Sequence, residues 1–189
     1  ANSRPNRNPV ANLKFSIIRS TQSDFIGLIG DIVRKETSAD CSIINAGSIR
    51  ADNNYEAGRY YSYGDVHDIY PFYKELCLIQ VTGKDVYLAL ENGVSKYPAL
   101  EGRFPQVSNI FFEFDPTKES GHRVNRETVL IAGKPLQDDK NYTIATTNFM
   151  ADGKDGYESF KNCIQLIDEN SRKTVRDVLL EFFGKLVLT

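Results

Sequence analysis

The sequence predicts a single mixed α/β domain, and three observations support this fold class. The chain has 189 residues, 41% of them hydrophobic and 25% charged, which is typical of one globular domain with a sizeable core. Apolar stripes with helical period alternate with short apolar runs of strand length. Neither internal repeats nor low-complexity segments interrupt this alternation. We therefore expect helices and strands to be mixed throughout residues 14–189.

Capping residues and apolar periodicity mark the helices. Ser23 or Asp24 can cap the first helix, and Thr82 can cap a second one that ends before Pro98. A short helix over 64–70 is stopped by Pro71. The apolar stripe of the first helix is Phe25, Leu28, Ile29, Ile32 and Val33, and that of the second is Val86, Ala89, Leu90, Gly93 and Val94. The last helix is capped by Ser171 and carries Val175, Val178, Leu179, Phe182 and Phe183 on one face.

Five apolar runs are predicted to be strands, and the segments between them to be loops. The runs cover residues 41–44, 75–81, 107–114, 128–132 and 142–147, with turns at Asp115-Pro116 and at 133–135. The tyrosine-rich residues 51–63 are predicted to be an exposed excursion. Residues 1–13 are polar, with two prolines and four asparagines, and are expected to be a linker or an inter-domain connection. The absence of an initial methionine suggests a processed protein or an excised fragment.

Composition excludes several classes of function. The net charge of −2 has both signs interspersed, so a nucleic-acid partner, which needs a basic face, is not expected. No apolar run approaches 18 residues, so no transmembrane segment is predicted. Cys41, Cys77 and Cys163 lie in apolar surroundings and are expected to be buried free thiols.

The sequence also lacks the motifs of a catalytic centre. Neither standard phosphate-binding glycine loop is present, and no serine or cysteine stands in a nucleophile motif. His67 and His122 are far apart in unlike contexts, whereas a hydrolytic metal site needs several converging ligands. We therefore expect a binding surface in this chain, with no catalytic residue and no metal site of its own.

The loop Asn148–Tyr157 is the most informative segment. It follows the predicted strand at 142–147 and contains two glycines, two aspartates and Phe149. Glycine permits positive φ and close approach, an aromatic ring can stack on a flat ligand, and a carboxylate can accept two neighbouring hydroxyl protons. This combination suits a flat, hydroxylated ligand. The alternative is a tight turn with solvated charges and Phe149 in the core.

Two further segments contain candidate binding residues. Asn45 and Arg50 flank Gly47 after the strand at 41–44, and both can donate to one anion or base edge; a purely structural arginine is the alternative. Phe72 follows Pro71 at the exit of a stopped helix, where an aromatic can be part of the core or face a ligand.

These pieces, in this order, resemble the C-terminal domain of the 5′-nucleotidase family, which includes UDP-sugar hydrolases and ecto-5′-nucleotidases. The resemblance rests on Asn45-Ala-Gly-Ser-Ile-Arg50, on Gly64-Asp-Val with Tyr70-Pro-Phe72, and on Asn148-Phe149 with Gly153-Lys-Asp-Gly-Tyr157. It covers nearly the whole chain and implies the layered fold of that domain. In the family, an N-terminal metallophosphoesterase domain holds two divalent metal ions, such as zinc, and performs the hydrolysis. The C-terminal domain holds the nucleoside.

The resemblance implies a role for each candidate residue. Phe72 and Phe149 would form an aromatic clamp around the nucleobase, and Asp155 would accept the ribose hydroxyls. Asn45 would contact the base or ribose, and Arg50 the ribose–phosphate side. The nearest candidate for a further family arginine is Arg19, although its distance to Gly27 is one residue longer than usual.

This chain departs from the family pattern in places. Ala46 and Ser48 replace glycines, Lys154 replaces another, and Tyr73 stands where a small or amide residue is common, which leaves base preference open. The metal domain is missing, so this chain alone is expected to be inactive. Family membership implies a nucleotide or nucleoside ligand, an extracellular, cell-surface or periplasmic location, and in some members a homodimer.

Two other functions stay open. A free-standing nucleoside-binding module would bind adenosine without any catalytic domain. A structural domain whose clamp has decayed would tolerate changes at Phe72 and Asp155 without any effect on ligand affinity. The presence of both aromatics and of Asn45, Arg50 and Asp155 favours the nucleotidase interpretation.

Overall fold

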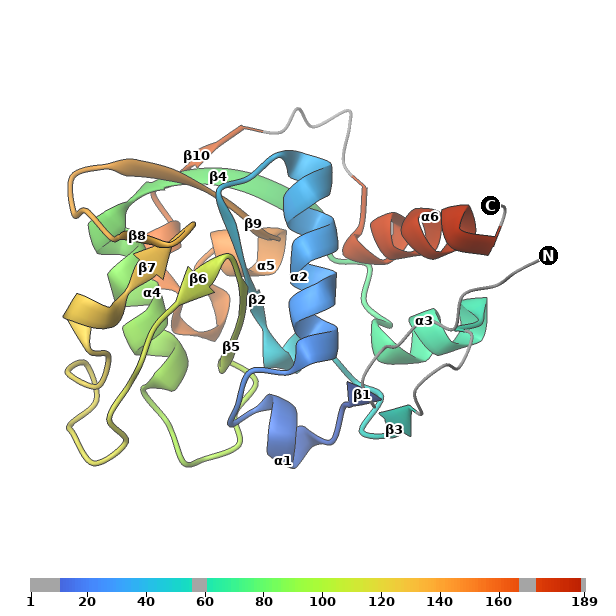
Figure 1. The fold of residues 1–189 in the computed structure, drawn as a ribbon, viewed down its shortest axis with the longest axis horizontal. Helices are drawn as coiled ribbons and strands as arrows, with labels where there is room; N and C mark the ends of the chain where they lie inside the picture. The colour runs from blue at the N-terminus through green and yellow to red at the C-terminus, as the bar shows by residue number, and fades with distance from the viewer. Residues whose placement is uncertain (1–10, 56–60, 167–172, 188–189) are drawn as a thin grey trace.

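A five-stranded sheet forms the centre of the molecule. The computed structural model describes residues 11–55, 61–166 and 173–187 (Figure 1). The strand order is β10-β4-β9-β2-β5, and within this sheet only β2 and β9 run parallel to each other. The bounds are β2 Cys41–Asn45, β4 Leu76–Thr82, β5 Pro105–Ser108, β9 Asn141–Thr147 and β10 Ile164–Gln165. All five residues of β2 are buried, as expected for a strand covered on both faces.

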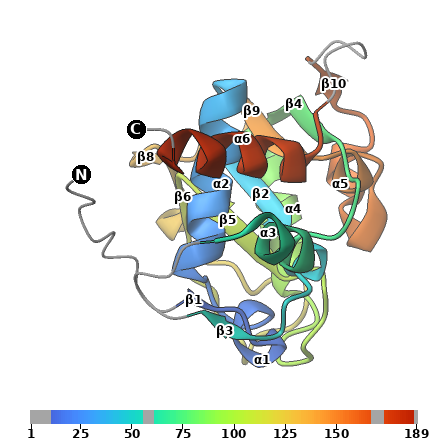
Figure 2. The same ribbon diagram turned by 90° about the vertical axis from the view of Figure 1, so that its right-hand side faces the viewer.

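Helices cover both faces of this sheet. Helix α2 (Asp24–Thr37) packs on β5, β2 and β9, and α4 (Gly83–Val94) packs on β4 and β5. The register places Ser42 opposite Ser108, and both lie under Gly30 of α2, whereas Pro105 of the other face meets Gly93 of α4. Helix α6 (Val175–Val187) packs on α2 and on α3 (Tyr63–Ile69) (Figure 2). The apolar stripes predicted for α2, α4 and the start of α6 are therefore confirmed as core positions.

Smaller elements complete the fold. A second sheet contains β6 (Ile110–Phe111), β7 (Leu130–Ile131) and β8 (Lys134–Pro135), and β1 (Ala11–Asn12) pairs with β3 (Asn54–Tyr55). Two short helices, α1 (Phe15–Ile18) and α5 (Asn148–Ala151), and single 3₁₀ turns over 46–48, 126–128, 154–156 and 158–160 lie between these elements.

Buried Glu91 of α4 ties the segment before β7 to the helix. Its carboxylate accepts from the hydroxyl of Tyr87 at 3.0 Å and from the backbone N–H groups of Arg123 and Val124 at 3.1 and 2.8 Å. Three donors offset the cost of burying this charge. Thr82 caps α4 as predicted, with Asp85 completing a capping box.

Three sequence-based predictions of elements are corrected by the structure. Residues 107–114 are not one strand: β5 ends at Ser108, and Asn109, with φ of 61°, turns the chain so that β6 joins the other sheet. Residues 51–63 are not uniformly exposed, because Tyr55 is only 4% exposed and pairs with Ala11. Since β1 lies in residues 11–12 and Leu13 is fully buried, the folded unit includes residues 11–13 of the predicted linker.

Helix termini also differ from the predictions in detail. Ser62 caps α3 through a capping box with Asp65. At α6, the hydroxyl of Thr174 accepts from the backbone N–H of Asp177 at 3.1 Å, so Thr174 caps the helix; Ser171 lies outside the described residues. Ser23 precedes α2 without a side-chain capping bond.

Two composition-based expectations can be compared with the described residues. There, no helix has the length and apolar character that crossing a membrane requires. The three cysteines are free thiols: Cys41 and Cys77 are buried, as predicted, but Cys163 is only half-buried.

Candidate functional site

The strand topology brings the candidate segments to one edge of the central sheet. Because β2 and β9 are parallel, the loops that follow Asn45 and Thr147 leave the sheet at the same end. Strand β4 is antiparallel to β9, and its first residue, Leu76, pairs with Thr147. The segment containing Phe72 therefore enters the sheet at this edge (Figure 1).

A chain of hydrogen bonds runs across this edge from a lysine to an aspartate. The Lys74 ammonium donates to the Ser48 hydroxyl at 3.3 Å, which donates to the Asn45 carbonyl at 2.5 Å. The Asn45 amide then donates to the Asp155 carboxylate at 2.7 Å. Asn45 is 1% exposed and Ser48 fully buried, so this chain, the Lys74–Asp155 relay, is shielded from water at its centre. Bonds of this kind polarise one another in a poorly solvated setting.

The backbone of Asp155 is held in an unusual conformation. Its φ of 55° lies in the left-handed region, as do those of Gly153 and Gly156 on either side of it. The Asn92 side chain donates to the Asp155 carbonyl at 3.0 Å. A side chain at position 156 would put its Cβ 2.4 Å from Asn92 Oδ1. The loop therefore needs glycine at this position to present the Asp155 carboxylate toward Asn45.

Phe72 and Phe149 form a pair of half-buried rings that share one cation. The Lys74 ammonium lies 3.8 Å from the centroid of the Phe149 ring and 5.0 Å from that of Phe72. The Arg50 guanidinium lies 5.2 Å from the Phe72 centroid. Both rings thus present faces to positive charge, the arrangement of a cation–π contact. We call Phe72 and Phe149 the ring pair.

Arg19 joins the same group of charges. Its guanidinium donates to the Leu100 carbonyl at 3.2 Å and stacks 4.4 Å from the Phe15 centroid. Burial lowers the pKa of Arg19, and the nearby charge of Arg50 lowers it further, while Asp52 and Asp155 oppose this shift. Its Nε is buried without a hydrogen-bond partner among the described residues. Arg19 therefore lies within electrostatic reach of Arg50 and Asp155, despite its unusual distance in sequence from Gly27.

Lys74 is the residue that the sequence analysis missed. Burial lowers the pKa of its ammonium, with Asp155 opposing and Arg50 reinforcing that shift. Arg50 and Asp155 each influence the pKa of both Lys74 and Arg19, so three cations and one carboxylate share this neighbourhood, an arrangement that attracts an anionic ligand. The available signal for Lys74 was its position two residues after Phe72, in the short segment between α3 and β4.

The sequence-predicted residues are thus brought together at one place. Asn45 contacts Asp155, Phe72 and Phe149 both contact Lys74, and Arg19 and Arg50 lie within electrostatic reach of each other. The alternative for the loop that follows β9 is a tight turn with solvated charges and Phe149 in the core. Phe149 does pack, partly buried, against the core, whereas Asp155 is not simply solvated because it accepts a bond from a buried amide. The ligand roles of all six residues stay predictions.

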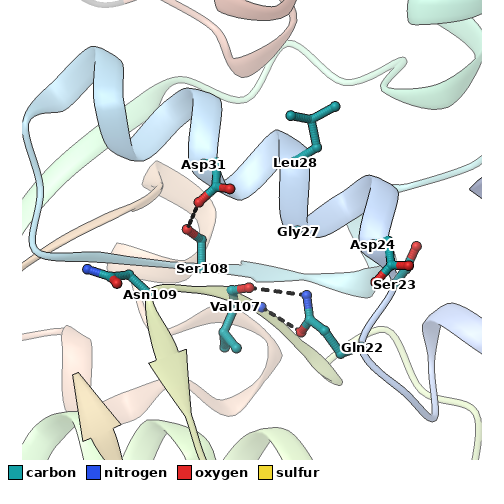
Figure 3. A pocket seen from close by; sticks show the side chains of 9 residues that line it. All are labelled: Gln22, Ser23, Asp24, Gly27, Leu28, Asp31, Val107, Ser108 and Asn109. Atoms are coloured by element: carbon teal, nitrogen blue, oxygen red, sulfur yellow. Dashed lines mark hydrogen bonds between the residues drawn. The ribbon is translucent and has the colours of Figure 1, made fainter. Parts of the chain in front are cut away.

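A separate hollow lies on the other side of β5. It has a volume of about 330 Å³ and includes Gln22, whose amide exchanges two hydrogen bonds with the Val107 backbone, at 3.1 and 3.0 Å (Figure 3). The Ser108 hydroxyl donates to Asp31 at its other end. None of the six candidate residues lines it; its walls are Gln22, Ser23, Asp24, Gly27, Leu28, Asp31, Val107, Ser108 and Asn109. Two of its polar side chains, Gln22 and Asp31, form hydrogen bonds with β5.

Metal ligands do not gather in the described part of the chain. There, no three His, Cys, Asp or Glu side chains are close enough to hold an ion together. His67 lies on α3 and its nearest acidic partner is Asp68, at 3.6 Å. The candidate residues at the edge of the sheet offer aromatic rings, cations and one carboxylate.

Comparison with known proteins identifies the family of this chain. A family model described as the C-terminal domain of 5′-nucleotidase matches residues 7–162. The chain belongs to the 5′-nucleotidase family. It corresponds to the C-terminal domain of that family, so the resemblance inferred from the sequence is confirmed.

Relatives and solved structures support the same assignment. The chain is 34% identical over 135 residues to the trifunctional nucleotide phosphoesterase protein YfkN of Bacillus subtilis (strain 168), covering 67% of this chain and 9% of that protein. It is 27% identical over 150 residues to 5′-nucleotidase of Homo sapiens, covering 76% and 26%. A crystal structure of a 5′-nucleotidase precursor from Thermus thermophilus superposes with a TM-score of 0.82 at 26% identity, over 94% of this chain and 35% of that one. The mixed α/β fold of this 5′-nucleotidase domain is confirmed.

The chain spans only part of these relatives. It matches 9% and 26% of the lengths of the two curated proteins and 35% of the Thermus chain. Activity, substrates and partners of the whole proteins are therefore considered below as proposals.

Proposed function

We propose that this chain is the substrate-binding domain of a 5′-nucleotidase-type hydrolase that removes phosphate from nucleotides. In this proposal Phe72 and Phe149 clamp the nucleobase, and Asp155 accepts the ribose hydroxyls. Asn45 orients Asp155 and contacts the base or ribose. Arg50 and Arg19 take the ribose–phosphate side.

The observation that supports this proposal is the ring pair and the carboxylate at one edge of the sheet. Two half-buried aromatic faces offer stacking worth about 1–3 kcal/mol per base. Asp155 has about four acceptor positions on its two oxygens, of which Asn45 uses one on Oδ2. A vicinal diol can therefore donate to the remaining positions, while the three cations attract the phosphate.

Hydrolysis is assigned to a second domain. We propose an N-terminal metallophosphoesterase domain as the partner, with two divalent ions such as zinc. When bound there, such ions polarise the phosphate and activate water. The residues of this chain hold the nucleoside so that its phosphate points at that domain. Orientation of this kind can lower the barrier by several kcal/mol, on the order of 7–11 kcal/mol at best.

The cellular location and the partners that we propose rest on the same resemblance. We propose a location outside the cytoplasm, at the cell surface, in the periplasm or in the extracellular space. A homodimer is compatible with the family. Nucleic acid is not proposed as a partner, since the net charge of −2 provides no basic face.

The first test is calorimetric titration of this chain with adenosine, inosine and uridine. We expect binding that weakens about 5- to 150-fold in Phe149→Ala, the equivalent of one lost stacking face. Phe111→Ala is the matched control, because that ring is 55% exposed on β6, and it should bind as the wild type does.

Three results would contradict the proposal. The first is the absence of binding for all three nucleosides, and the second is binding that Phe149→Ala leaves unchanged. The third is turnover of AMP by the purified chain alone, since hydrolysis is assigned to the partner domain. Retained binding with no upstream metal-ligand motifs in the gene would leave a nucleoside-binding module.

A further inference from the structure

The Lys74 ammonium occupies a position that a stacked base would need. It lies within 3.8 and 5.0 Å of the centroids of Phe149 and Phe72, the two rings proposed to hold the base. A base that stacks on both rings must therefore displace the ammonium or meet it at its edge. No other described side chain contacts both rings through a charged group.

Within the described chain, the Lys74 ammonium is held by two cation–π contacts and one long hydrogen bond. Among the described residues its hydrogen bond goes to Ser48 Oγ, at 3.3 Å, which is near the upper limit for such bonds. Burial lowers the pKa of the Lys74 ammonium and the negative charge of Asp155 opposes that shift, but the two groups form no ion pair among the described residues. A half-buried ammonium with one long hydrogen bond has donors left to offer, and the four-carbon stem allows it to move aside.

The position of Lys74 in the chain limits how far its ammonium can move. Lys74 lies two residues after Phe72, in the irregular segment that enters β4, and its ammonium lies 5.0 Å from the centroid of the Phe72 ring. When a base enters between the rings, the ammonium stays within reach of the edge of that base. An ammonium has three donors and no acceptor, so it discriminates between acceptor and donor groups on that edge.

From this geometry, and resting on the proposed function, we propose that Lys74 is a specificity-determining residue that favours bases with an exocyclic carbonyl. Hypoxanthine and guanine carry a carbonyl oxygen at C6, and cytosine and uracil carry one at C2, whereas adenine carries an amine at C6 and accepts only through its ring nitrogens. The C6 amine of adenine is a donor, so it cannot accept a hydrogen bond from the Lys74 ammonium. Oxopurine and pyrimidine nucleotides are thus the preferred substrate class, and adenine nucleotides are disfavoured.

The test compares inosine with adenosine, which have the same size and the same ribose and differ in the C6 group. We expect inosine to bind the wild-type chain about tenfold more tightly, the effect of one charge-assisted hydrogen bond at a half-exposed site. Lys74→Met should bring the two dissociation constants within about twofold of each other while both nucleosides still bind. Lys74→Gln, whose amide both donates and accepts, should do the same and serves as a second variant if the methionine variant folds poorly. Lys118→Met, at an exposed lysine far along the chain, should keep the wild-type ratio.

The outcomes separate this inference from the proposed function. Equal binding of the two nucleosides by wild type, tighter binding of adenosine, or a ratio unchanged in both Lys74 variants would overturn the role of Lys74 and leave the nucleoside site intact. Absence of any nucleoside binding by wild type would overturn the proposed function, and the specificity role with it. A tenfold preference for inosine over adenosine that disappears only in the Lys74 variants would establish the specificity role of Lys74.

Discussion

Removal of the Asn45 side chain should destabilise the domain, because Asn45 stands in the middle of the Lys74–Asp155 relay. In Asn45→Ala the Ser48 hydroxyl loses its acceptor and the Asp155 carboxylate loses its amide donor. Asn45 is 1% exposed, so water does not replace these bonds without rearrangement. The perturbation therefore removes two hydrogen bonds at a buried position.

The magnitude follows from the two bonds. The bond to Asp155 involves a charge and is worth about 1.5–3 kcal/mol, and the bond from Ser48 about 1 kcal/mol. Since Asp155 is half-exposed, we take the lower part of the range and expect a loss of about 2–3 kcal/mol. For a domain of this size, 1 kcal/mol corresponds to roughly 2–4 °C, so the melting temperature should fall by about 4–12 °C.

Differential scanning calorimetry measures this change directly. Asn141→Ala, at an exposed position of β9, is the matched control and should melt within about 2 °C of wild type. A double-mutant cycle with Asp155→Asn, which tolerates the positive φ of that position, should yield a coupling energy of about 1–2 kcal/mol. A melting temperature of Asn45→Ala indistinguishable from that of Asn141→Ala would refute the reasoning.

Three further predictions concern single positions. Gly156→Ala should lower the free energy of unfolding by about 2–3 kcal/mol, because alanine is strained at φ of 81° and its Cβ would meet Asn92 Oδ1 at 2.4 Å. Urea denaturation measures this loss, and an unchanged free energy of unfolding would contradict the prediction. Burial raises the pKa of the Cys41 thiol to about 12. At pH 8 a thiol reagent should therefore modify half-exposed Cys163 in the native protein and Cys41 only after unfolding. Rapid labelling of native Cys41 would be inconsistent with the structure. Glu91→Ala leaves three donors unpaired and should lower the free energy of unfolding by about 3–4 kcal/mol, measured by chemical denaturation; Glu91→Gln should lower it clearly less. Equal losses in the two variants would show that the charge and its donors do not matter.

Local sequence determined most of the regular elements. Helix α4 begins after Thr82 as predicted, because its cap and its 3.6-residue apolar stripe act within the segment itself. Strands β4 and β9 were predicted within a residue or so at each end, since their apolar runs fit a buried central position. The family motifs also made it possible to name the six candidate residues before any coordinates.

Tertiary structure decided where these pieces meet. The turn at Asn109, which sends residues on either side into different sheets, depends on which partner strand each half finds. Tyr55 is buried because β1 pairs with β3, a contact between distant segments that no local pattern records.

The candidate site shows most clearly which features depend on local sequence and which depend on tertiary structure. The residue types at Asn45 and Asp155 can be read from the sequence, but their 2.7 Å bond joins positions 110 residues apart and exists only because β2 and β9 are adjacent and parallel. Lys74 is an ordinary lysine in the sequence; it meets both rings only because β4 pairs with β9 in the register that sets Leu76 opposite Thr147. The sequence determined by itself which chemical groups the chain carries and which helices and strands it forms. The pairing of the strands decided which of those groups face one another, because side chains distant in sequence come into contact only through long-range packing.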